Sequence, residues 1–139
     1  MRLTRLTAVA ILAMFIFACS IERVPLVATD VSIKQPMPGM QMTAGYLTLS
    51  NNTTQAIKIT QVSSPQFDSV EMHESVVEDG MARMYPLGDL TILAGRTVQF
   101  EPGGKHLMLM RPVGEFETVT LEFHADKAIV LTLNVALSD

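Results

Sequence analysis

Short stretches of alternating hydrophobic and polar residues run along most of the chain, separated by clusters of Gly, Pro, Asn and Asp about every ten residues. This pattern predicts about nine short strands. They lie at 31–34, 45–50, 57–63, 69–75, 82–85, 97–101, 106–111, 118–124 and 129–136. No stretch after residue 30 keeps the 3.6-residue period of a helix over ten residues. The pattern is typical of an all-β, antiparallel sandwich.

The N-terminus departs from this pattern, because residues 6–18 form an apolar run without a charge. Arg2 and Arg5 precede the run, as in the signal peptide of an exported protein. The run is also shorter than the roughly 20 residues that a membrane span takes. It ends in the sequence IFACS at 16–20, which resembles a bacterial lipobox around Cys19.

We therefore expect 1–18 to be a lipoprotein signal peptide, 19–29 a lipidated N-terminus with a short tether, and 30–139 a single domain. Acylation of Cys19 predicts an exported lipoprotein that the membrane holds in the periplasm. Ser20 in place of Asp after the cysteine favours the outer membrane where a cell has one. Ordinary signal cleavage and an uncleaved anchor are the alternatives.

Composition narrows the possible chemistry of this domain. Apolar residues make up 48% of the chain, enough for a hydrophobic core, and the net charge of −4 with no run of Lys or Arg gives no footprint for nucleic acid. Cys19 is the only cysteine, so the domain body has no disulfide, thiolate metal site or thiol nucleophile. It also has no Gly-x-Ser-x-Gly or His-Glu-x-x-His pattern, and we expect no enzyme activity.

Methionine and histidine are the remaining candidates for chemistry, and they alternate with leucine at 106–110. In a strand, His106, Met108 and Met110 share one face while the two leucines occupy the other. If the leucines fill the core, the His and Met side chains look outward. Residues two apart lie about 6.6 Å along a strand, a gap that a flexible thioether and an imidazole can close around one ion.

The ligand chemistry indicates which ion such a site would choose. Thioethers are soft, neutral ligands that suit Cu(I), whereas Ca²⁺ and Mg²⁺ need oxygen ligands and structural zinc sites use thiolates. Outside the cytoplasm a cysteine site can oxidise to a disulfide, which methionine cannot form. The residues therefore favour Cu(I).

The spacing of these residues resembles a known family, the periplasmic copper chaperones related to PCu(A)C. That family shares a pattern of His, ten residues, Met, twenty-one residues and then His-x-Met. This chain has His73, Met84 and His106-Leu107-Met108 at the same intervals. The stretches 44–51, 70–74 and 102–110 also look like the family, and the resemblance covers about residues 25–137.

The resemblance implies a cupredoxin-like Greek-key fold that binds one Cu(I) through His73, Met84, His106 and Met108. It also implies delivery toward the Cu(A) centre of cytochrome c oxidase, often alongside a thioredoxin-like Sco protein. Two departures matter. Many members have Met directly after the first His, where this chain has Glu74, and this chain lacks the His/Met-rich C-terminal tail of some members. We therefore expect a single high-affinity site.

The other methionines and the third histidine keep simpler interpretations. Met72 alternates with Val70 and is expected in the core. Met110 either packs behind the ligands or simply covers the site. His124 is expected at the surface without a role. The methionines at 37, 40 and 42 form either a copper-collecting loop or an apolar loop packed on the domain.

Two other functions stay open at this point. A copper-sequestering or tolerance lipoprotein would carry the same site without delivering the ion. A structural β-sandwich without a metal site is the second alternative. A blue-copper electron carrier is excluded, because it needs a cysteine ligand that the domain body lacks.

Overall fold

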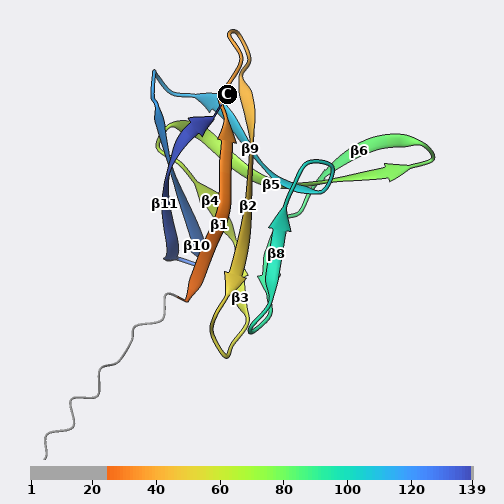
Figure 1. Cartoon of the computed structure of the whole chain (residues 1–139), viewed down its shortest axis with the longest axis vertical. Coiled ribbons are helices and arrows are strands. Elements are labelled where there is room, and N and C mark those ends of the chain that lie inside the picture. The colour runs from red at the N-terminus through yellow and green to blue at the C-terminus, as the bar shows by residue number, and fades with distance from the viewer. Residues whose placement is uncertain (1–24, 139) are drawn as a thin grey trace, which may run out of the picture.

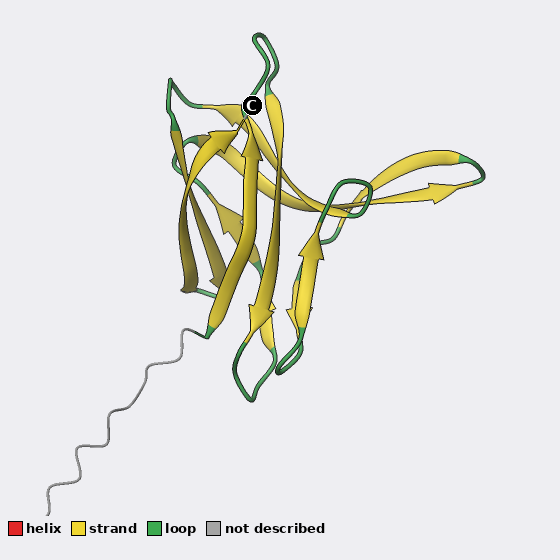
Figure 2. Cartoon of the chain, viewed as in Figure 1, coloured by secondary structure: helices red, strands yellow, loops and turns green. Residues whose placement is uncertain are grey.

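The computed structural model describes residues 25–138, and this part of the chain consists of strands and loops (Figures 1 and 2). Eleven strands are formed. They are β1 (Leu26–Lys34), β2 (Met42–Asn51), β3 (Ile57–Ile59), β4 (Gln61–Ser63), β5 (Phe67–Glu78), β6 (Met81–Pro86), β7 (Leu90–Ile92), β8 (Thr97–Phe100), β9 (Lys105–Pro112), β10 (Thr118–Ala125) and β11 (Ala128–Ser138). No helix within residues 25–138 is long and apolar enough to cross a bilayer.

Seven of the strands close into a barrel. They follow one another in the order β1-β11-β10-β4-β5-β9-β2, and β2 pairs back with β1 to complete the ring. β1 runs parallel to β11 and antiparallel to β2. β8 pairs with β2 at the end that β9 does not reach, and β3 and β7 form a separate two-stranded sheet. The all-β prediction is confirmed.

The first strand begins earlier than the sequence pattern indicates. β1 starts at Leu26, whose side chain is completely buried, so residues 26–29 belong to the barrel and the expected domain start at residue 30 is wrong. The register against β2 shifts between Thr29 and Ser32, and Asp30 has a φ of 52°. This bulge inserts an extra residue, which is why Leu26 and Ile33 both point inward although the offset between their positions is odd.

Two further differences concern short strands. The predicted strand 57–63 is two strands, because the chain leaves the small sheet at Thr60, whose backbone N–H donates to the carbonyl of His124, and then joins the barrel as β4. β7 has only three residues, too few for alternation to reveal it. The expected tether from residue 19 and the signal peptide lie outside the described residues, apart from the part of β1 just named.

The barrel is filled by side chains from every wall. Leu107 and Leu109 of β9 are completely buried, as the alternation predicted, and Met72 of β5 is buried beside them, as expected. Other large core residues include Leu47, Leu49, Phe67, Phe100, Leu121 and Phe123. Because a strand alternates its faces, burying these residues turns the neighbouring positions of β5 and β9 outward.

β5 is longer than the barrel wall to which it belongs. Its pairing with β9 ends where Glu74 lies opposite Lys105, and the remaining residues pair only with β6. Figure 1 shows this β5–β6 hairpin projecting sideways from the barrel. The outer face of β5 therefore continues from the barrel wall onto an exposed arm.

Candidate metal centre

The candidate centre lies on the outer face of the β5–β9 pair. Their antiparallel register sets His73 directly opposite His106, with ring centroids 6.0 Å apart, and sets Glu71 opposite Met108. Met108 is thus a diagonal neighbour of His73 and lies two residues from His106 on the same face. The structure brings these three predicted ligands together.

A tight turn fixes the ring of His106. Gly104 donates its N–H to the carbonyl of Glu101 (3.0 Å), with Pro102 second in the turn and Gly103 third at a φ of 81°, which is a type II turn that glycine favours. The Gly104 carbonyl then accepts the Nδ1–H of His106 (3.0 Å) and the backbone N–H of Ser75 (3.0 Å). With Nδ1 as donor, the lone pair of His106 Nε2 is available to a metal.

His73 is oriented differently, by a carboxylate. Its Nε2 lies 2.8 Å from Oε2 of Glu71, two residues earlier on the same face, and donates its proton to that oxygen. Its Nδ1 is buried and has no hydrogen-bond partner among the described residues. Buried polar atoms are rarely left unpaired, so an unpaired imidazole lone pair beside a second histidine fits a metal ligand.

His106 is more buried than the sequence pattern indicated. We expected His106, Met108 and Met110 to look outward; Met108 and Met110 are partly exposed, but His106 is only 6% exposed. The ring of His73 and the turn at Gly104 lie against it. The two imidazoles therefore form the sheltered floor of the site, and Met108 lies at the side that is open to solvent.

Met84 is the predicted ligand that stands apart from the others. It lies on β6 opposite Ser75, two residues beyond His73, on the same face of the hairpin. Half of it is exposed. Met81 lies opposite Glu78 on the other face of the hairpin, as alternation predicted. Met84 is therefore a diagonal neighbour of His73, about 7–8 Å away, at the corner opposite Met108.

Residues 25–138 contain no cluster of charged side chains that could hold a hard cation. No group of three or more His, Cys, Asp or Glu residues in this part of the chain is placed to hold a metal ion. The candidate centre contains two imidazoles and thioethers, and its one carboxylate, on Glu71, bonds to a ring nitrogen. That donor set suits a soft monovalent ion.

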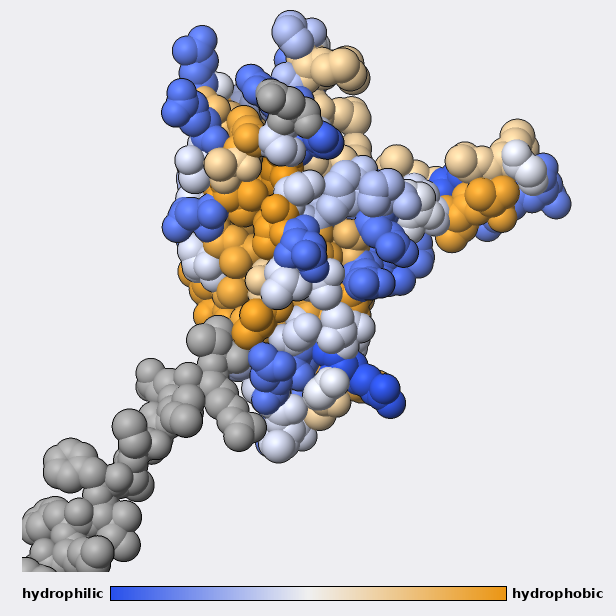
Figure 3. All heavy atoms as spheres, in the orientation of Figure 1, coloured by the Kyte–Doolittle hydropathy of each residue, from blue (hydrophilic) through white to orange (hydrophobic). Residues whose placement is uncertain are grey.

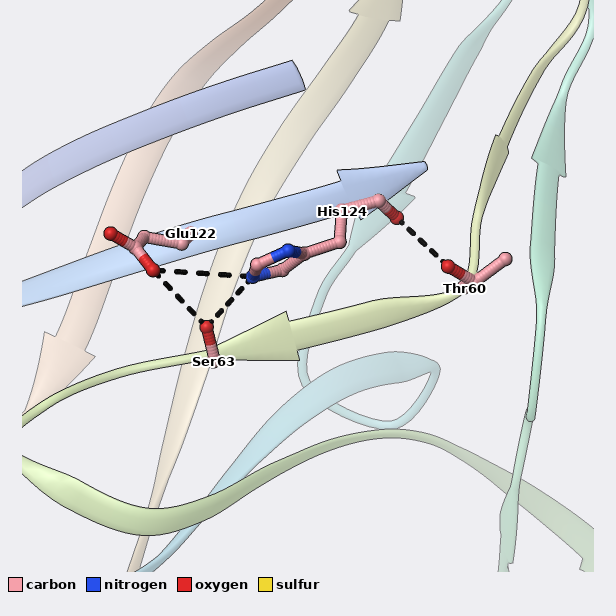
Figure 4. A network of polar contacts seen from close by, with 4 residues as sticks. All are labelled: Thr60, Ser63, Glu122 and His124. Atoms are coloured by element: carbon pink, nitrogen blue, oxygen red, sulfur yellow. Dashed lines mark hydrogen bonds and ion pairs between the residues drawn. The ribbon is translucent and has the colours of Figure 1, made fainter. Parts of the chain in front are cut away.

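His124, expected to be a surface residue, is instead mostly buried, and its side chain is 18% exposed. Its Nε2 lies 2.8 Å from the hydroxyl of Ser63 and 4.0 Å from a carboxylate oxygen of Glu122 (Figure 4). A catalytic serine, histidine and carboxylate need the serine and the acid on opposite ring nitrogens. Here both face the same nitrogen, so the network joins β4 to β10 without forming a relay.

The chain belongs to the LpqE-like family, because the family model described as "Putative lipoprotein LpqE-like" matches residues 26–137. A relative, the "Putative lipoprotein Lxx21020" of Leifsonia xyli subsp. xyli, is 31% identical over 61% of this chain and 55% of its own length. The chain spans about half the length of the curated relatives that it matches.

Solved PCuAC domains share the fold. The copper-bound PCuAC domain from PmoF2 superposes with a TM-score of 0.66 at 17% identity, over 82% of this chain and 92% of that one. The solution structure of apo-DR1885 from Deinococcus radiodurans is 28% identical over 99% of this chain and 93% of that one, with a TM-score of 0.57, and a Cu(I) form of DR1885 has also been solved. The cupredoxin-like fold and the PCu(A)C resemblance are confirmed.

Two features of the centre were not singled out from the sequence. Glu71 orients His73, and the carbonyl of Gly104 orients His106. Glu71 could have been found, since it precedes His73 by two residues and so shares its face. The role of Gly104 could not, because a backbone carbonyl leaves no mark in the sequence.

Replacing Glu71 with Ala removes the hydrogen-bond acceptor that orients the ring of His73. We expect Cu(I) affinity to fall about 10- to 100-fold, the usual effect of losing such a partner. Competition with a chromogenic Cu(I) chelator measures this, in a Cys19→Ala background so that no thiol competes.

Glu74→Ala is the matched control, because Glu74 lies on the opposite face of β5 in an ion pair with Lys105. The Cu(I) affinity of the Glu74→Ala variant should equal that of the parent. Equal affinities for Glu71→Ala and the parent would show that the carboxylate does not support a metal ligand.

Proposed function

We propose that this chain is an exported Cu(I)-binding metallochaperone. The observation that carries the proposal is the pair His73 and His106, whose rings lie 6.0 Å apart beside Met108, with a buried, unpaired Nδ1 on His73. Copper in the related PmoF2 and DR1885 structures supports the choice of ion.

The proposed ligands are His73, Met84, His106 and Met108, around one Cu(I) per chain. The carbonyl of Gly104 orients His106 and the carboxylate of Glu71 orients His73, so the two imidazoles are already positioned before the ion binds. Met84 must come from the hairpin. Beyond Glu74 this hairpin is a two-stranded ribbon, which twists more readily than a strand held on both sides, and a bend toward β9 would carry Met84 toward the imidazoles.

The exposure of the thioethers supports delivery of copper over storage. Met84 and Met108 both reach the surface, so an acceptor could replace them one at a time while the imidazoles still hold the ion. Following the resemblance to the PCu(A)C chaperones, we propose the Cu(A) subunit of cytochrome c oxidase as the acceptor, with a Sco-like protein as its companion. The same site without such exchange would make a copper-sequestering lipoprotein.

Single substitutions of the four ligands to Ala should each weaken Cu(I) binding by about 100-fold, equivalent to about 2.7 kcal/mol, because a site with so few ligands cannot replace one. Chelator competition under anaerobic, reducing conditions measures the affinity.

The hairpin provides a matched control in Met81. It is as exposed as Met84, three residues away and on the opposite face, so Met81→Ala should leave the affinity unchanged. If Met84→Ala also bound as tightly as the parent, Met84 would not be a ligand; if the parent bound no Cu(I), the metal-free alternative would replace the proposal.

We also propose that Cys19 is acylated and anchors the domain to a membrane, most simply the outer membrane where one exists. The lipoprotein family of the chain supports this, and Cys19 itself lies outside the described residues. Cys19→Ala should move the protein from the membrane fraction to the soluble fraction or leave it uncleaved. An intact mass without acyl chains on the membrane-extracted parent would overturn the anchor.

A further inference from the structure

The loop between β1 and β2 presents two methionines from a tight turn. Met40 donates its N–H to the carbonyl of Met37 (2.9 Å), with Pro38 second and Gly39 third at a φ of 81°, again a type II turn. Met37 is 69% exposed and Met40 is 47% exposed. Pale orange, moderately hydrophobic residues lie at the top of Figure 3, where this loop leaves the barrel. The loop is thus ordered by its own turn and leaves its thioethers exposed.

This exposure decides between the two interpretations of the loop. An apolar loop packed on the domain would bury its methionines, because burial of the side chain is what makes methionine useful in a core. Met37 and Met40 instead belong to the exposed large hydrophobic residues in the described part of the chain, and so does Met42, at 45%. Packing does not account for them.

The β2–β9 register connects this loop to the candidate metal centre. Met42, the first residue of β2, lies directly opposite Met110, and Ala44 lies opposite Met108. Opposed residues have Cβ atoms about 4.5–5.5 Å apart, within reach of two thioethers for a shared ion. Met42, Met110 and Met108 therefore follow one another on the outer face, in a line that ends at His106 and His73.

The geometry points to a second, weaker Cu(I) site formed by Met42 and Met110, next to the centre described above. It takes a soft monovalent ion, because its donors are neutral sulfurs. It is weaker because it lacks an imidazole.

The inference rests on the proposed function for the direction in which copper moves between the two sites, since the ion passes between Met110 and Met108. One Cu–S bond forms at Met108 as one breaks at Met42. The copper stays Cu(I), and neither an electron nor a proton moves.

Ag(I) provides a redox-inert probe of this site. The full chain with Cys19→Ala, in detergent and labelled with ¹³C at the methionine methyl groups, is titrated with Ag(I) and followed by NMR. The first equivalent should shift the methyls of Met84 and Met108. The second should shift those of Met42 and Met110 with at least tenfold weaker affinity.

The double variant Met42→Leu/Met110→Leu keeps side-chain volume and removes both sulfurs. It should lose the second equivalent and retain the first, whereas Met81→Leu, an equally exposed control, should retain both. Met42→Leu alone, at an exposed position, repeats the test without risk to the core.

A second equivalent that persists in the double variant, or that shifts Met81, overturns the inference. A normal first equivalent without any shift at Met42 and Met110 also overturns it, and leaves the proposed function intact. A shift at Met42 and Met110 when Met84, Met108 and the histidines bind nothing supports the second site and contradicts the proposed function.

Discussion

The antiparallel pairing of β5 with β9 is the constraint on which the candidate centre depends. It places His73 opposite His106 and Met108 one diagonal away. The register itself is held by burial, since Leu107 and Leu109 fill the core from β9 and Met72 does so from β5. A slip of one residue would turn these side chains to solvent and the histidines into the barrel. The hydrophobic core therefore determines where the ligands meet.

The site combines a rigid half with a half that has fewer neighbours. The histidines sit on strands of the closed barrel, and each ring is oriented by a hydrogen bond, to Glu71 or to Gly104. Met84 sits on β6, which pairs only with β5. In a carrier protein this division is useful, because the fixed imidazoles retain the ion while the thioether on the arm can be exchanged for a ligand of the acceptor.

Much of the fold could be predicted from alternation, and the reasons for the errors are local. The bulge at Asp30 breaks the alternation of β1, so the buried Leu26 was assigned to a tether. β7 is too short to show a period. For the site, alternation placed Met108 and Met110 correctly, but the burial of His106 depends on the neighbouring ring and turn, which only the paired strands bring together. The distance of Met84 from Met108 likewise depends on how far β5 extends beyond β9.

The central claim is that the chain binds Cu(I) and transfers it to an acceptor protein. The most direct test loads the chain, in the Cys19→Ala background, with one equivalent of Cu(I) and mixes it with the apo form of a soluble Cu(A) domain from cytochrome c oxidase. Separation of the two proteins and metal analysis of each then show where the copper lies. The account predicts that copper moves to the Cu(A) domain within minutes and leaves a folded, metal-free carrier. Copper that remains on the chain would contradict delivery and would identify a sequestering lipoprotein.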